Sequence, residues 1–186
     1  MTLLQTRSRA EVQYSTPALH DGPDLASMAR RCFAETFARR YRSEDLDAFL
    51  ATAYGPNGLL AELKDPEVDF RIARCDGQII GYAKVAPLRA PAPDPQPGAL
   101  ELCQLYVLQP WHGTGVATAL MEWALATARE RRAPEIYLTV FENNHRAKRF
   151  YARHDFADVG ECFFHVGSHV DEDRIWGRAL VHDCRS

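Results

Sequence analysis

The pattern of apolar and polar residues divides the chain into helical and extended segments. In some segments apolar residues recur at roughly every third or fourth position, which is the spacing of one buried helix face. In others they alternate with polar residues or form short continuous runs, as buried strands do. The predicted helices cover residues 24–40, 43–53, 59–64, 116–131 and 144–153. The predicted strands cover residues 12–14, 68–75, 78–86, 100–108, 136–141, 157–166 and 174–181.

The order of these elements predicts a mixed α/β domain. Helices come first, then antiparallel strands joined by a turn at Asp76-Gly77, and then alternating strands and helices. Residues 87–98 are rich in proline, which suits neither a helix nor a sheet interior, and we interpret them as a long, stiff connection between two strands. A chain of 186 residues fits one domain, and residues 1–186 are assigned to it.

Composition narrows the class of function. The net charge of −3 and the pI near 6.2 argue against nucleic-acid binding, which needs a basic surface. No apolar run is long enough to span a membrane, and Leu3-Leu4 is too short for a signal-peptide core. We therefore expect a soluble, cytoplasmic protein that binds neither nucleic acid nor membrane.

The cysteines and histidines do not suggest a metal site. The chain has 5 cysteines without a Cys-x-x-Cys pair, so neither a zinc site nor a disulfide framework is indicated. These residues are Cys32, Cys75, Cys103, Cys162 and Cys184. His165 and His169 have helical spacing but flank a predicted turn at Gly167-Ser168, which argues against a shared metal ion.

The segment 112–117 carries the most readable chemistry. Gly113 and Gly115 let the main chain approach a ligand closely, just before a predicted helix whose first N–H groups are free. Such a helix start is the positive end of the helix dipole and binds phosphate groups. A dinucleotide fingerprint is excluded because Thr118 stands where its third glycine belongs. A Walker loop is excluded because Val116-Ala117 replaces its Lys-Ser/Thr pair.

This loop and a second motif downstream resemble two motifs of GNAT-type N-acetyltransferases. The first motif reads Gln/Arg-x-x-Gly-x-Gly/Ala, and residues 112–117 depart from it only at His112. The second reads Asn-x-x-Ala-x-x-Phe-Tyr-x-x-x-Gly-Phe, and residues 144–156 depart from it only at Asp155, where we expect a left-handed backbone. The resemblance covers residues 67–181 well. It implies the GNAT fold, a mixed and mostly antiparallel central sheet with helices on both faces.

The resemblance also implies acetyl-CoA as co-substrate. The loop would hold its pyrophosphate through backbone N–H groups, and the His112 imidazole could meet a phosphate. The preceding strand would pair with the pantetheine arm, and the second motif would hold the cofactor chain. The implied binding residues are Leu105, Tyr106, Val107, His112, Gly113, Thr114, Gly115, Val116, Ala117, Asn144 and Ala147.

Two residues are candidates for proton transfer. Tyr151 matches the tyrosine that family members use as general acid, and a phenol pKa of ~10 lies close to the about 8.5 of a departing thiol. Glu101 matches a glutamate that some GNAT enzymes use as general base toward an ammonium group, whose deprotonation at pH 7 costs about 4–5 kcal/mol. The alternatives are a packing role for Tyr151, which the adjacent Phe150 already serves, and a solvated strand glutamate for Glu101.

Within the superfamily the chain looks closest to bacterial polyamine (spermidine/spermine) N-acetyltransferases, on residues 37–54, 102–107 and 164–168. The resemblance implies transfer of an acetyl group to a primary amine of a small molecule, a polyamine among them, by direct attack in a ternary complex. Glu44, Asp45, Asp47 and Glu101 are candidate partners for its ammonium groups, although the first three also suit an exposed helix start. Acetylation of a protein N-terminus or an antibiotic, a non-catalytic acyl-CoA sensor and a homodimer stay open.

Overall fold

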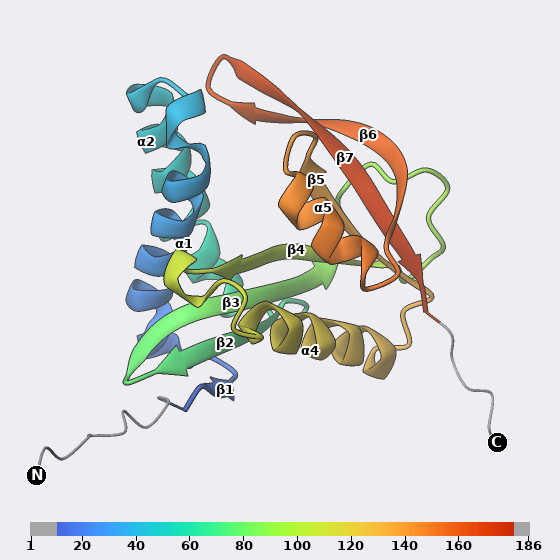
Figure 1. Ribbon diagram of the computed structural model, residues 1–186, viewed down its shortest axis with the longest axis horizontal. Helices are drawn as coiled ribbons and strands as arrows, with labels where there is room; N and C mark the ends of the chain where they lie inside the picture. Colours follow the sequence, from blue (N-terminus) through green and yellow to red (C-terminus); the bar gives the residue numbers. More distant parts are fainter. Residues whose placement is uncertain (1–10, 181–186) are drawn as a thin grey trace, which may run out of the picture.

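A computed structural model describes residues 11–180 of the chain (Figure 1). Within this range one 7-stranded sheet has the order β1-β2-β3-β4-β5-β7-β6. All neighbouring strands are antiparallel except β4 and β5, which are parallel. The strands are β1 (Gln13–Ser15), β2 (Asp69–Cys75), β3 (Gln78–Pro87), β4 (Leu100–Val107), β5 (Glu135–Phe141), β6 (Ala157–Val166) and β7 (His169–Ala179).

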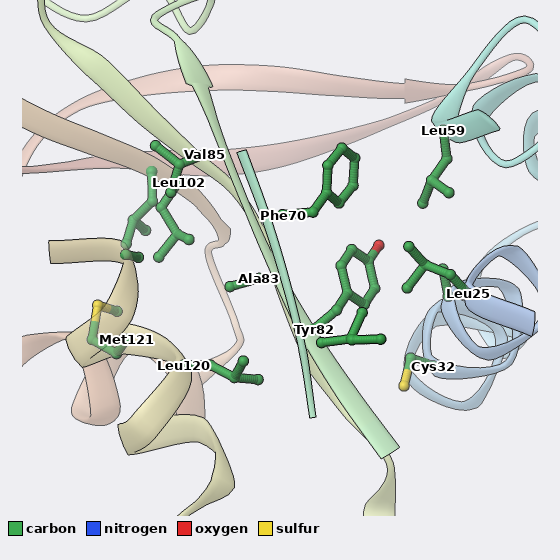
Figure 2. Close-up of a cluster of buried hydrophobic side chains, with 14 of the residues drawn as sticks. Leu25, Cys32, Leu59, Phe70, Tyr82, Ala83, Val85, Leu102, Leu120 and Met121 are labelled. Carbon is green, nitrogen blue, oxygen red and sulfur yellow. The ribbon is translucent and has the colours of Figure 1, made fainter. Parts of the chain in front are cut away.

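Helices cover both faces of the sheet, and residues of β3 show how the layers form. Tyr82 points toward the first helix beside Leu25 and Cys32, whereas Ala83 points toward Leu120 on the opposite face (Figure 2). Successive strand residues face opposite sides, so one strand supplies both cores. The helices are α1 (Gly22–Phe37), α2 (Ser43–Ala53), α3 (Leu59–Glu62), α4 (Val116–Glu130) and α5 (His145–Ala152), with 3-10 turns η1 (Leu19–Asp21), η2 (Ala38–Arg40) and η3 (Gln109–Trp111).

The parallel strands β4 and β5 separate soon after they begin. Their pairing is limited to Leu100 with Ile136 and Glu101 with Tyr137. On its other side, β4 pairs with β3 along its length, with a register shift that leaves Cys103 as an extra residue. The edge of β4 that faces β5 therefore has no strand partner beyond Glu101. The two strands diverge from there, and we call this gap in strand pairing the opening.

The fold predicted from the sequence is confirmed, with corrections at some element ends. The helix predicted over 24–40 ends at Phe37 and continues as η2, and the helix predicted over 59–64 is limited to α3. The last strand was predicted from Arg174, but β7 begins at His169 because it pairs with β6 directly after the Gly167-Ser168 turn. Asp155 has the expected left-handed backbone, with φ of 60°. Leu3-Leu4, Val181 and Cys184 lie outside the described residues.

Two further findings concern the described residues alone. None of the helices within residues 11–180 is long and apolar enough to cross a membrane. In the same range, His, Cys, Asp and Glu side chains form no group of three or more that could hold a metal ion.

Candidate active site

The glycine loop presents a row of backbone donors at the start of α4. Gly115 is the N-cap residue with φ of 96°, and Gly113 has φ of 77°, both conformations that favour glycine. A Cβ built on either glycine meets no protein atom within 4 Å, so space is open above the loop. Among the described residues, the N–H groups of Gly115, Val116 and Ala117 have no protein acceptor. This geometry fits the phosphates of acetyl-CoA.

His112 does not offer a free imidazole to a ligand. Its Nε2 lies 2.8 Å from the carbonyl oxygen of Val107, and its Nδ1 lies 2.7 Å from Nη1 of Arg146. A carbonyl oxygen only accepts, so Nε2 carries the hydrogen and Nδ1 accepts from the guanidinium. The expectation that His112 meets a phosphate stays a prediction. In the structure, His112 holds the Arg146 cation beside the loop.

Asn144 begins α5 as its N-cap residue. Its Oδ1 accepts a hydrogen bond of 3.1 Å from the N–H of Ala147. This contact explains why the helix starts here, and it leaves the side-chain NH₂ group without a hydrogen-bond partner among the described residues. The sequence-predicted roles of Asn144 and Ala147 toward the cofactor stay predictions.

The strand residues predicted to line the pantetheine arm sit at the open part of β4. Tyr106 lies on the α1 side, with its ring 5.6 Å from the ring of Tyr82 and its hydroxyl 3.5 Å from that of Tyr54. Burial raises the pKa of Tyr106 to about 12. Its strand neighbours Leu105 and Val107 face the opposite side by alternation. The predicted pairing of this strand with the cofactor has an edge available for it.

Tyr151 lies on α5 in an aromatic environment. Its ring centroid is 5.6 Å from that of Phe150 and 6.1 Å from that of Phe156. Burial, followed by the proximity of Tyr106, raises the pKa of the Tyr151 phenol. The hydroxyl therefore stays protonated at neutral pH, as a proton donor must. It has no hydrogen-bond partner within residues 11–180, so it is free to meet a ligand.

Glu101 already has a structural role. Its Oε2 accepts hydrogen bonds of 2.9 Å from the N–H groups of Arg89 and Ala90, at the start of the proline-rich connection. It also lies at the end of β4 that still pairs with β5, roughly 20 Å along the strand from Val107. Its catalytic role stays a prediction.

The carboxylates predicted at the start of α2 do not gather around the opening. Glu44 is exposed and pairs with Arg42 at 3.3 Å, and Asp47 is exposed as well. Asp45 packs against the turn at Gly167, and its Oδ2 is buried without a hydrogen bond in the described part of the chain. These residues are therefore divided between the surface and the β6–β7 turn.

Two buried carboxylates on β7 were missed by the sequence reasoning. Asp171 accepts hydrogen bonds from Arg40, from the Tyr41 hydroxyl and, at 3.1 Å, from His169. Burial alone would raise the pKa of Asp171, but these donors outweigh it and hold the pKa below its usual value. Asp173 is 9% exposed and has no hydrogen bond or ion pair among the described residues. Burial and the charge of Asp171 raise the pKa of Asp173 to about 6.

A cavity of about 250 Å³ lies at the β6–β7 end of the sheet. Its side chains include Asp158 and Glu161, which both pair with Arg174. No residue that lines it belongs to β4, to the glycine loop or to α5. Asp173 also lines it, although its side chain and that of the next residue, Arg174, face opposite sides of the sheet. The cavity therefore reaches Asp173 but none of the residues predicted to bind the cofactor.

The comparisons with known proteins agree with this geometry. The model of the acetyltransferase (GNAT) family matches residues 23–156. An uncharacterised N-acetyltransferase of Mycobacterium tuberculosis is 35% identical over 161 residues, which are 87% of this chain and 99% of the relative. Another, from Lactobacillus delbrueckii subsp. lactis, is 29% identical over 161 residues, 87% of this chain and 93% of the relative.

Solved structures show the same fold. The PaiA N-acetyltransferase of Thermoplasma acidophilum in complex with coenzyme A has a TM-score of 0.71 at 19% identity, over 91% of this chain and 99% of that one. The yncA protein of Salmonella typhimurium, solved with acetyl-CoA, has a TM-score of 0.69 at 14% identity, over 95% and 98%. Together with the family match and the mycobacterial relative, these findings establish that the chain belongs to the GNAT family and is an acetyl-CoA-dependent N-acetyltransferase.

Proposed function

We propose that the chain acetylates a primary amine of a small cationic molecule, with polyamines as the first class to test, by direct attack in a ternary complex. The observation that carries this proposal is the excess of buried carboxylate on the α1 side of the opening. Asp171 and Asp173 lie there with one guanidinium, that of Arg40, which Asp171 already binds. An acceptor that brings its own positive charge fits such a surface better than a neutral one.

The phosphates of acetyl-CoA are assigned to the glycine loop. The backbone N–H groups of Gly113 and of residues 115–118 would bind the pyrophosphate, and Arg146 would add a side-chain cation. The open edge of β4 at Leu105–Val107 would take the pantetheine arm as an added strand would be taken. These assignments are supported by the unpaired donors of the loop and by the early end of β4–β5 pairing.

Tyr151 is assigned the role of protonating the leaving group. A thiolate that departs from the tetrahedral adduct needs a proton, and the phenol of Tyr151 keeps its proton at neutral pH. Its position near Tyr106, which its electrostatic interaction with that residue indicates, puts it close to the open edge of β4. The hydroxyl would then be within reach of the sulfur at the end of the arm.

A panel of acceptors tests the proposal. Thiol release from acetyl-CoA is measured with spermidine, with a small monoamine and with a peptide that has a free N-terminus, each at low and moderate salt. Spermidine should be acetylated fastest, and its KM should rise with salt because ions screen, over ~8–10 Å, the attraction that draws a polycation toward an acidic site. If the peptide is the best acceptor, or if salt leaves the KM for spermidine unchanged, the cationic small-molecule assignment is wrong while the family assignment stands.

A further inference from the structure

Asp173 is a carboxylate that the fold buries without giving it a partner. Its residue is 9% exposed, and no donor in residues 11–180 hydrogen-bonds to it. Burying an unpaired charge costs several kcal/mol in general, so buried carboxylates in folded proteins are normally paired. Asp171, two positions away on the same face of β7, shows the normal case with three donors. Asp173 therefore lacks the partner that a buried carboxylate normally has.

The surroundings of Asp173 supply no free cation within the described residues. The groups that interact with it are Asp171 of β7, Arg40 and Tyr41 at the end of η2, Tyr106 of β4 and Cys162 of β6. Arg40 is bound to Asp171, and its guanidinium also stacks at 4.0 Å over the ring of Phe141. The tyrosine and cysteine neighbours are neutral, with pKa values raised by burial. The local charge is thus left negative.

The position of Asp173 connects it to the acyl-transfer site. It pairs across the sheet with Phe141, the last residue of β5, at the wide end of the β4–β5 opening. Its charge raises the pKa of Tyr106, which also interacts with Tyr151 on α5. Tyr106 therefore lies near both Asp173 and Tyr151.

We propose that Asp173 binds the ammonium group of the acceptor and takes its proton, so that the neutral amine attacks the thioester. This inference rests on the proposed function and names the residue that makes the acceptor reactive. Glu101 is the rival for the role, but its carboxylate is held by two main-chain N–H groups. An aspartate with an ordinary pKa of 3.8 would be a weaker base than one at about 6, by about 10² in the proton-transfer equilibrium.

The proton balance of the reaction closes with these residues. Asp173 receives one proton from the ammonium, and the freed lone pair of the nitrogen forms the new C–N bond with the acetyl carbonyl carbon. The C–S bond then breaks with its electron pair on sulfur, which takes the phenolic proton of Tyr151. The nitrogen loses its second proton, which restores Tyr151, and Asp173 releases its own proton to solvent. The products are the N-acetylated amine, the free thiol and one proton.

The test compares Asp173→Asn with Asp173→Glu and with a matched control, Glu172→Gln, whose residue is exposed on the opposite face of β7. The kcat/KM for spermidine is measured from pH 5 to 9, and spermidine binding is measured by calorimetry in the presence of CoA. The parent and Glu172→Gln should lose kcat/KM below a pH of about 6, where Asp173 is protonated. Asp173→Asn should lose about 10²–10⁴-fold and show no such fall, and Asp173→Glu should restore part of the rate.

The outcomes separate this inference from the proposed function. If Asp173→Asn keeps the parent's rate and its fall of kcat/KM at acidic pH, Asp173 is not the base. Acetylation of spermidine by the parent would still support the proposed function. If Glu101→Gln instead removes the fall of kcat/KM at acidic pH, Glu101 is the base. If the parent neither binds nor acetylates spermidine or the monoamine, both the function and this role fall. The melting temperature of Asp173→Asn shows whether a loss of rate comes from unfolding.

Discussion

Neutralising the two buried carboxylates of β7 should change the stability of the protein in opposite directions. The pKa of Asp173 is about 6 in the folded state and 3.8 without its surroundings, a difference of about 2 units or about 3 kcal/mol. Because the folded pKa is the higher one, the folded state binds more protons between these values. The contribution of Asp173 to the free energy of unfolding is therefore most favourable below pH 3.8, and this stability is lost as the pH rises through about 6.

Asp173→Asn removes this loss because an amide stays neutral. At pH 7–8 the variant should be up to about 3 kcal/mol more stable than the parent, which for a protein of this size raises Tm by about 6–12 °C. At pH 4 the two proteins should melt together. The gain in stability would accompany the loss of activity expected for the same variant, as is common for residues kept for function.

Asp171→Asn should have the opposite effect. It removes the charged acceptor of Arg40, Tyr41 and His169, and breaking a buried ion pair costs about 3–5 kcal/mol. Arg40 is 36% exposed and its charge is partly screened by solvent, so we expect a cost at or below the lower end of that range, about 2–3 kcal/mol. The pKa of Asp171 is lowered in the folded state, so this difference should be largest at neutral pH and should shrink as the pH falls through that pKa.

Thermal unfolding of the parent and both variants between pH 4 and 8 gives the measurement. Equal Tm values for Asp173→Asn and the parent at pH 8 would show that Asp173 is not an unpaired buried charge. A lower Tm for Asp173→Asn at all pH values would show that the carboxylate is instead a stabilising acceptor. Either result would remove the physical basis for its proposed role.

Three other predictions concern the cofactor side. Gly115→Val should abolish the rise of Tm with acetyl-CoA, which corresponds to about 2.7 kcal/mol at 100 times Kd. The control Gly77→Val, at a similar positive φ in a hairpin, should lose basal stability but keep this rise of Tm. A rise preserved in both variants would exclude the glycine loop as the cofactor site. Tyr151→Phe should lower kcat by about 10²–10⁴ with little change in CoA affinity, and a kcat within about twofold of the parent assigns it to packing. Arg146→Gln should weaken CoA binding, measured by calorimetry, more at low salt than at high salt. His112→Phe should weaken it in the same way but less strongly. Equal CoA affinities of the parent and Arg146→Gln at low salt would contradict a phosphate contact.

Local chemistry made the backbone geometry of the candidate cofactor site predictable from the sequence. Gly115 and the helix after it, Asn144 as a helix cap, and Asp155 in a left-handed position are each specified by a few neighbouring residues. The contacts of His112 were not predictable in this way. Its partner Arg146 lies 34 residues away, and only the folded chain brings the two together.

The proposed acceptor site depends on long-range packing. Asp171 meets Arg40 across a separation of 131 residues, so no local pattern distinguishes it from a surface aspartate. The acidic segment at the start of β7 resembles a loop, which is why the strand was predicted to begin at Arg174. A signal was present, since β6 ends just before the Gly167-Ser168 turn and a hairpin strand returns directly after such a turn. Strand alternation from His169 would then have placed Asp171 and Asp173 on one face.

A crystal structure with a bisubstrate analogue, in which spermidine is joined to the sulfur of CoA through an acetyl linker, tests the central claim most directly. We expect its pyrophosphate on the N–H groups that follow Gly113, its arm along the open edge of β4, and the linker nitrogen within hydrogen-bond reach of Asp173. A pyrophosphate bound elsewhere would contradict the cofactor assignment. A spermidine moiety that leaves the opening away from β7, with Asp173 still unpaired, would contradict the account of how the amine is bound and activated.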